Sequence, residues 1–188
     1  MRSFLALPFS KCMQNQLFLL QKNLMDDSLY NIKWVAKNNF HLTLFFFKNL
    51  SVEEMEILNR GINSIASLLP KITIKTTRLG CFPSLNKPSV LWLGIEENQE
   101  IKDSYFVIKD FLIKQRIYVD EKDFHPHITL GRIKEVKNRN GFRNLLQQKL
   151  QDLPQLLEKI GEIHLYESRL NTGGPIYIVK NKYFLNSQ

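Results

Sequence analysis

The sequence predicts an α+β fold with two lobes that a pseudo-two-fold axis relates. Each lobe is expected to be a mainly antiparallel sheet with helices packed outside, and a cleft lies between the lobes. Strand-like and helix-like segments are mixed without the strict alternation of a parallel sheet. A strand-helix-strand pattern over residues 40–77 also recurs over 124–170. With 188 residues, 44% of them hydrophobic, the chain can form a full core, and we expect one bilobal domain over 1–188.

The first segments alternate between the apolar patterns of strands and of helices. Residues 4–9 are apolar and predict a strand, and Ser10 is a suitable N-cap for a helix over 10–24. The polar segment 26–33 predicts irregular structure. Residues 40–47 are rich in aromatic and β-branched side chains and predict a strand.

A capping box of Ser51 and Glu54 begins the second predicted helix, which ends before Pro70. Residues 71–77 and 90–95 have the alternation of strands. The segment between them is rich in Gly, Pro, Ser and Asn, so it predicts a loop.

The second half repeats this mixture. Residues 98–115 predict a helix and 124–133 a strand, and 139–160 is a leucine-rich helical stretch that Pro154 breaks or kinks. The last two predicted strands, joined by the turn Asn171-Thr172-Gly173-Gly174, are residues 161–170 and 175–185.

The cysteines and the apolar runs indicate the compartment. Only Cys12 and Cys81 are present and no C-x-x-C motif occurs, which favours a reducing environment. The apolar start is too short for a signal peptide, since Pro8 and Lys11 interrupt it, and no run approaches a membrane span. We expect a cytoplasmic monomer with no membrane contact and no obligate protein partner.

The charge is concentrated in two stretches. The chain has 26 Lys and Arg against 18 Asp and Glu, a net charge of +8. Residues 71–90 contain four basic and no acidic side chains, and 132–149 contain six basic side chains and one Glu. Such local excess suits an anionic partner, above all nucleic acid. Composition alone equally allows basic residues that only solvate exposed helices and loops.

The motif H-x-T-L occurs twice, as His41-Leu42-Thr43-Leu44 and His127-Ile128-Thr129-Leu130. Because side chains alternate along a strand, each histidine shares a face with its threonine, and the apolar residues take the other face. Two lobes packed about a two-fold axis bring both faces into one cleft.

Two facing imidazoles suit acid–base cleavage of a phosphodiester. The neutral one removes a proton from water, and the protonated one donates to the leaving oxygen. The threonine hydroxyls, with nearby backbone amides, can hold the phosphate oxygens, and the chemistry needs no metal or cofactor. It predicts a bell-shaped pH–rate profile with a maximum near neutrality. From the pattern alone, both histidines could instead be structural.

These motifs resemble those of the 2H phosphoesterase superfamily. Within it the chain is most similar to the bacterial and archaeal RNA 2′,3′-cyclic phosphodiesterases, historically called 2′-5′ RNA ligases. Further segments that resemble the family are Phe4–Pro8, Lys33–Val35, Gly80–Pro83, Pro88–Gly94, Phe124–Arg132 and Glu167-Ser168 with the Gly173-Gly174 turn.

The resemblance implies an enzyme that opens the terminal 2′,3′-cyclic phosphate of RNA to a 2′-phosphomonoester. It assigns His41 as the proton donor to the departing 3′ oxygen and His127 as the base that activates water. Thr43, Thr129 and Arg132 correspond to phosphate ligands. A weak, reversible 2′-5′ joining of RNA ends also occurs in the family. The two basic stretches are then expected to rim the cleft and hold the RNA backbone.

The chain departs from the family pattern at two places. Phe45 and Lys48 stand where the family commonly has a cation and a glycine. Phe45 is expected on the face of His41, either stacked on a base or, as we favour, in the core. His125 stands where many relatives have Arg, and on the face of His127 it is a candidate ligand of the phosphate or the terminal base.

Two rival functions stay open. Asp123, His125 and His127 alternate onto one face and could chelate a metal, which would make the protein a metal-dependent phosphohydrolase. The other rival is a protein that binds RNA ends without reacting, and the departures at Phe45 and His125 are its support.

Overall fold

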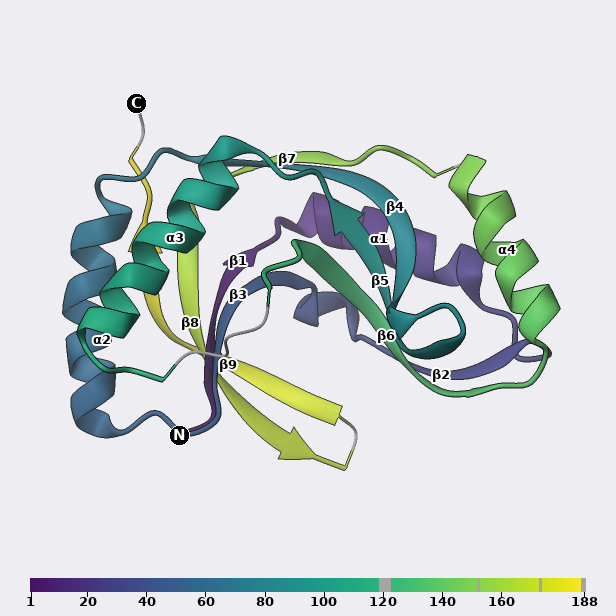
Figure 1. The fold of residues 1–188 in the computed structure, drawn as a ribbon, viewed down its shortest axis with the longest axis horizontal. Helices are drawn as coiled ribbons and strands as arrows, with labels where there is room; N and C mark the ends of the chain where they lie inside the picture. Colours follow the sequence, from purple (N-terminus) through teal and green to yellow (C-terminus); the bar gives the residue numbers. More distant parts are fainter. Residues whose placement is uncertain (119–122, 152, 173, 187–188) are drawn as a thin grey trace.

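The computed structural model describes residues 1–118, 123–151, 153–172 and 174–186, and it is an α+β fold around one curled antiparallel sheet (Figure 1). The strands are β1 (Ser3–Pro8), β2 (Tyr30–Trp34), β3 (His41–Phe47), β4 (Ile72–Ser84), β5 (Lys87–Ile95), β6 (His127–Val136), β7 (Leu157–Ile160), β8 (Glu162–Asn171) and β9 (Gly174–Phe184). The helices are α1 (Lys11–Leu24), α2 (Val52–Ala66), α3 (Gln99–Lys114) and α4 (Arg139–Gln151), with a 3₁₀ turn η1 (Lys37–Asn39).

The sheet consists of two halves that meet at its centre. Its strand order is β7-β4-β5-β6-β3-β1-β8-β9, and β2 pairs with β6 outside this path. The halves join between β3 and β6, where Leu42 pairs with Ile128. Counted outward from this contact, β1, β8 and β9 of one half correspond to β5, β4 and β7 of the other. The predicted bilobal α+β class is confirmed.

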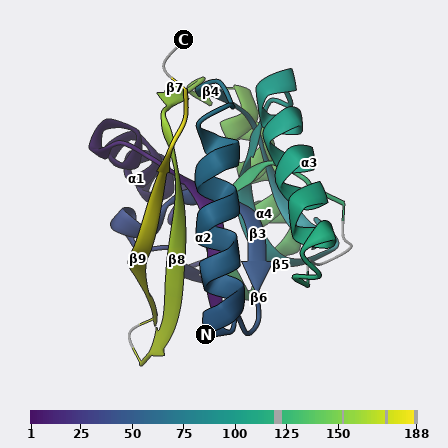
Figure 2. The same cartoon turned by 90° about the vertical axis from the view of Figure 1, so that its left-hand side faces the viewer.

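The helices cover the outside of the curled sheet, and α1 and α2 begin at the predicted caps Ser10 and Ser51. Ser10 and Asn98 accept backbone N–H bonds at the starts of α1 and α3, and the Ser51–Glu54 capping box is complete. Helices α2 and α3 lie side by side, and α2 packs against β9 (Figure 2). In the described part of the chain, no helix combines the length and the apolar character that crossing a membrane requires.

Three predicted elements differ from the structure. The polar segment that predicted irregular structure contains β2, whose strand conformation comes from pairing with β6. The predicted loop after residue 77 is instead a hairpin of β4 and β5, with Ser84 opposite Lys87. The helix predicted to Ile160 ends at Gln151, and beyond Pro154 the chain forms β7 along β4. The predicted final hairpin is present, with Gly173 outside the described residues.

Candidate active site

The two H-x-T strands lie antiparallel at the centre of the sheet. Leu42 and Ile128 pair in register and are both fully buried. Their flanking residues therefore project to the opposite face, with His41 across from Thr129 and Thr43 across from His127. All four are half-buried. The pseudo-two-fold axis passes between the strands, so the structure brings both motifs together on one surface.

Each motif ends in a β-bulge at its leucine. Leu44 is the extra residue of β3 relative to β1, and Leu130 is the extra residue of β6 relative to β5. An extra residue reverses the alternation of side chains. The fifth residue after each histidine consequently returns to the histidine face, and these residues are Phe46 and Arg132. Both line the same cavity.

The bulge corrects the expectation for Phe45. Its side chain lies on the face away from His41 and is 5% exposed, with its ring stacked on Tyr105 at a centroid distance of 4.7 Å. The predicted shared face with His41 is therefore wrong, because sequence alternation does not register a bulge. The favoured core position of Phe45 is confirmed.

Hydrogen bonds set the tautomer of His41. Its Nδ1–H donates to the Asn39 carbonyl at 2.7 Å, so Nε2 of the neutral ring carries no proton. Nε2 lies 3.0 Å from Thr43 Oγ1 and accepts from the hydroxyl. The nitrogen that faces the cleft is thus held in place by the threonine of the same motif.

Aromatic rings enclose His41. Phe4 stacks on its ring at 4.7 Å, Tyr177 meets it edge-on at 5.3 Å, and the Tyr166 ring lies 6.3 Å from it. This burial lowers the pKa of His41 to about 4, and the charge of His127 adds to the effect, whereas the bond to Asn39 opposes it. His41 is therefore neutral at pH 7 in the protein alone.

His127 has an equivalent hydrogen bond and different neighbours. Its Nδ1–H donates to the carbonyl of His125 at 2.7 Å, which leaves an unprotonated Nε2. Phe82 meets the ring edge-on at 4.9 Å and Trp92 lies 6.3 Å away. Burial lowers the pKa of His127, and the charge of His125 acts in the same direction, while the hydrogen bond to the His125 carbonyl raises it. The ring is suited to accept a proton.

The residues before β6 differ from the expectation of one extended strand. Asp123 and His125 precede the strand and are exposed, and the His125 ring lies 6.4 Å from the ring of Phe82. Its carbonyl, rather than its ring, orients His127. Among the described residues, no three His, Cys, Asp or Glu side chains form a group that could hold a metal ion.

A cavity of about 330 Å³ opens beside His41. From the predicted site, His41, Thr43, Thr129 and Arg132 line it, while His127 and His125 do not. Its other lining residues include Arg2, Lys33, Trp34, Asn39, Phe46, Ser168 and Tyr177. The tip of the β8–β9 hairpin covers one side, where Asn39 Nδ2 donates to the Pro175 carbonyl at 3.0 Å.

Sequence reasoning missed most of the cavity wall. Of the two basic stretches, only Arg132 lines the cavity; the other cations are Arg2, which directly precedes β1, and Lys33 of β2. Aligning the two H-x-T-L copies places Phe46 at the position of Arg132, so that signal was available. Lys33 and Tyr177 carry no comparable signal, because sheet pairing alone brings them to the site.

A second group of polar side chains lies behind the aromatic rings. His164 is buried on β8, with Nδ1 3.0 Å from the Tyr166 hydroxyl and Nε2 3.0 Å from Glu162. Burial, together with the charge of Glu162, raises the pKa of Tyr166 to about 12. His164 and Glu162 thus hold the Tyr166 side chain, whose ring stacks on Phe4 at 5.0 Å.

The chain is similar to known proteins over most of its length. The family model described as LigT like phosphoesterase matches residues 7–92 and 96–177. An RNA 2′,3′-cyclic phosphodiesterase of Methanocaldococcus jannaschii is 29% identical over 180 residues, which covers 95% of this chain and 98% of that protein. One from Aquifex aeolicus is 30% identical over 155 residues, with 81% of each chain covered.

A solved structure has the same fold. The crystal structure of Escherichia coli LigT complexed with 3′-AMP superposes with a TM-score of 0.78 and 22% identity, covering 100% of this chain and 98% of that one. At this identity the likeness concerns the fold. The family model spans nearly the whole chain, including both H-x-T strands. The chain therefore belongs to the LigT-like phosphoesterase family.

Proposed function

We propose that the protein is an RNA 2′,3′-cyclic phosphodiesterase that opens a terminal cyclic phosphate to a 2′-phosphomonoester. The pairing of β3 with β6 is the observation that carries the proposal, because it sets two imidazoles and two hydroxyls on one face. The relatives from Methanocaldococcus jannaschii and Aquifex aeolicus bear the name of this activity and match most of the chain.

The shape of the cavity supports different roles for the two histidines. In ring opening, the leaving 3′ oxygen stays attached to the nucleoside, whereas the attacking water is small. The cavity lies against His41 and not against His127, so its volume suits a nucleoside on the His41 side. His41 is then the proton donor to the 3′ oxygen, and His127 is the base.

The tautomers of His41 and His127 indicate which nitrogen atoms accept and donate the protons. Nε2 of His127 takes a proton from water as the water oxygen bonds to phosphorus. The bond from phosphorus to the 3′ oxygen breaks, and Nε2–H of His41 donates to that oxygen. Thr43 and Thr129 hold the oxygens of the cyclic phosphate, and Arg132 is a further phosphate-binding cation. Since His41 is neutral in the protein alone, it takes up its proton as the phosphate anion arrives, which raises its pKa.

The same path with another nucleophile would join RNA ends weakly. If a ribose hydroxyl takes the place of water, attack on the cyclic phosphate forms a 2′-5′ phosphodiester. Because water is in large excess, hydrolysis dominates. We propose this joining as a minor activity of the same two histidines.

The test is a short RNA that ends in a 2′,3′-cyclic phosphate, with the product phosphate isomer identified. The expected product is the 2′-phosphate, formed by the wild-type protein and not by His127→Ala. If both proteins bind the RNA and leave its end untouched, the molecule is an RNA-end-binding protein instead. Activity abolished by a chelator and restored by a metal would favour the metal-dependent alternative.

A further inference from the structure

Two cations face each other across the β2–β6 strand pair. Lys33 of β2 lies directly opposite Arg132 of β6, and both side chains line the cavity beside His41. Like charges at directly opposed positions of an antiparallel pair repel and destabilise it. The pair is therefore unfavourable for the fold itself, and an anion bound between the two side chains would relieve the repulsion.

Among the described residues, no acidic side chain neutralises this pair. In the described part of the chain, neither Lys33 nor Arg132 forms an ion pair or a side-chain hydrogen bond. None of the residues that line the cavity is Asp or Glu. Arg2, the third cation of the cavity, differs because its guanidinium lies over the Phe46 ring at 4.9 Å.

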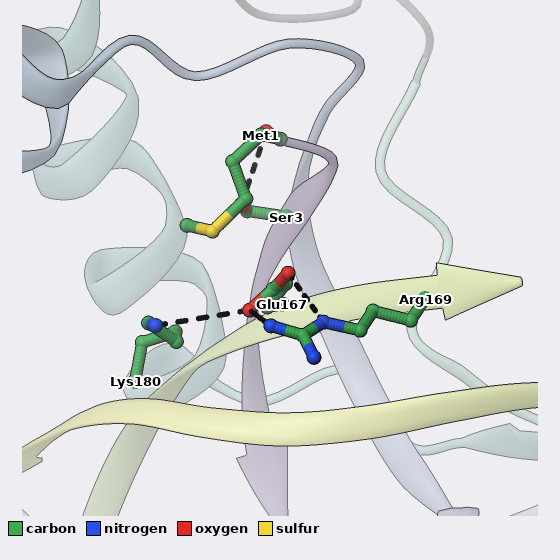
Figure 3. Close-up of polar contacts among 5 residues, drawn as sticks. All are labelled: Met1, Ser3, Glu167, Arg169 and Lys180. Carbon is green, nitrogen blue, oxygen red and sulfur yellow. Dashed lines mark hydrogen bonds and ion pairs between the residues drawn. The ribbon is translucent and has the colours of Figure 1, made fainter.

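The neighbouring β8–β9 hairpin shows the opposite arrangement. Glu167 accepts from Arg169 Nε at 2.7 Å and lies 3.7 Å from Lys180 Nζ (Figure 3). Ser168, the next residue along β8, lines the cavity, so alternation places Glu167 and its cations on the other face. Glu167 thus compensates Arg169 and Lys180 on that face, whereas Lys33 and Arg132 have no such partner among the described residues.

The distance from the cation pair to the site proposed for the cyclic phosphate is about the length of one nucleotide. Arg132 is two ladder positions beyond Thr129 along β6, roughly 7 Å. Lys33 is one strand further out, and its Nζ lies 3.7 Å from the point where a Cβ on Gly174 would stand. The ammonium group is therefore held at the hairpin tip, at the far side of a cavity that suits one nucleoside.

We propose that Lys33, together with Arg132, binds a second phosphate of the substrate, the one on the 5′ carbon of the terminal ribose. This inference rests on the proposed function, which places the cyclic phosphate at His41 and Thr129. It identifies the substrate class as an RNA strand end or a 5′-phosphorylated nucleotide. A nucleoside 2′,3′-cyclic phosphate with a free 5′ hydroxyl lacks this contact.

The test compares two unreactive ligands that differ only in the 5′ phosphate. Isothermal titration calorimetry measures the Kd of adenosine 2′-monophosphate and of adenosine 2′,5′-bisphosphate. We expect the wild-type protein to bind the bisphosphate about ten-fold more tightly, the effect of one charge-assisted contact. In Lys33→Ala and in Lys33→Gln the two affinities should come within about two-fold of each other.

Lys159→Ala is the matched control, since it removes one exposed lysine from β7, a strand at the edge of the sheet. This variant should keep the ten-fold preference. Equal affinities in the wild-type protein, a preference that survives both Lys33 variants, or an equal loss in Lys159→Ala would each overturn the subsite. Binding needs no turnover, so failure of the RNA assay with the preference intact would refute the proposed function alone.

Discussion

His41 and His127 occupy equivalent positions on two antiparallel strands, yet their surroundings differ. Both donate Nδ1–H at 2.7 Å to the carbonyl two residues earlier, which leaves Nε2 unprotonated in each. Only His41 lines the cavity and has its Nε2 bonded to the threonine of its own motif. The repeated backbone therefore sets the tautomer, and the covering strands set the proton affinity and the access.

The same comparison extends to the residue after each bulge. Arg132 places a cation at one end of the histidine face, whereas the equivalent position in the other half holds Phe46. A nucleotide bound as we propose would therefore meet charge in one direction and an aromatic ring in the other. The internal symmetry of the backbone is broken by side chains, which gives the site a direction along which RNA can lie.

Removing each imidazole should have the largest effect, and it tests whether the two histidines have paired roles. His41→Ala and His127→Ala should each lower kcat on cyclic-phosphate RNA by about 10²–10⁴, because each ring transfers one proton in the reaction. The double variant should lose little more, since the two act in one step. His125→Ala, which removes an exposed neighbour, is the control and should stay within about ten-fold of wild type. Circular dichroism checks the fold of each variant, and full activity in either single variant would contradict the paired roles.

Because of the bulge in β3, we expect alanine substitutions of two adjacent phenylalanines to differ in their effects on stability and on KM. Phe45→Ala should lower the free energy of unfolding by about 3–5 kcal/mol, because it leaves a cavity where the ring stacked on Tyr105. Phe46→Ala removes a half-buried ring and should cost less than half as much while raising KM. Urea denaturation and steady-state kinetics measure the two. Similar stability losses would mean that the alternation does not reverse at Leu44.

The two threonines sharpen the comparison because only one contacts its histidine. Thr43→Val removes both a phosphate ligand and the partner of His41 Nε2, so kcat/KM should fall by roughly 10²-fold or more. Thr129→Val removes a phosphate ligand and should lose roughly ten-fold. Thr43→Ser, which keeps the hydroxyl, should restore most of the activity. Equal losses at both positions would show that the Thr43–His41 bond has no role.

The lowered pKa values of both histidines change the expected pH profile. The active free protein needs His41 protonated and His127 neutral, and both pKa values lie below 6.5. The maximum of kcat/KM should therefore lie below pH 6.5 rather than near neutrality. Bound phosphate favours the protonated His41, so the kcat profile should be displaced to higher pH. If the pH profiles of kcat and kcat/KM coincide, or stay flat from pH 5 to 9, His41 is not the proton donor and His127 is not the base.

Local periodicity was enough to predict the helices and the central strands. Capping residues located the starts of α1 and α2, since an N-cap satisfies backbone groups of its own helix. The alternation of H-x-T-L placed each histidine beside its threonine. Likewise, the repeated motif indicated the two halves of the sheet and the paired site, because the same local pattern occurs twice in the sequence.

Only the tertiary structure decided the rest. Strand β2 is polar and exists because it pairs with β6, and each bulge depends on the register of a neighbouring strand. The pKa of His41 depends on Phe4 and Tyr177, which come from opposite ends of the chain. The opposed cations Lys33 and Arg132 likewise meet only through sheet pairing. The sequence alone thus determined the reactive side chains and their faces, whereas packing between distant segments determined their proton affinity, their access and their direction.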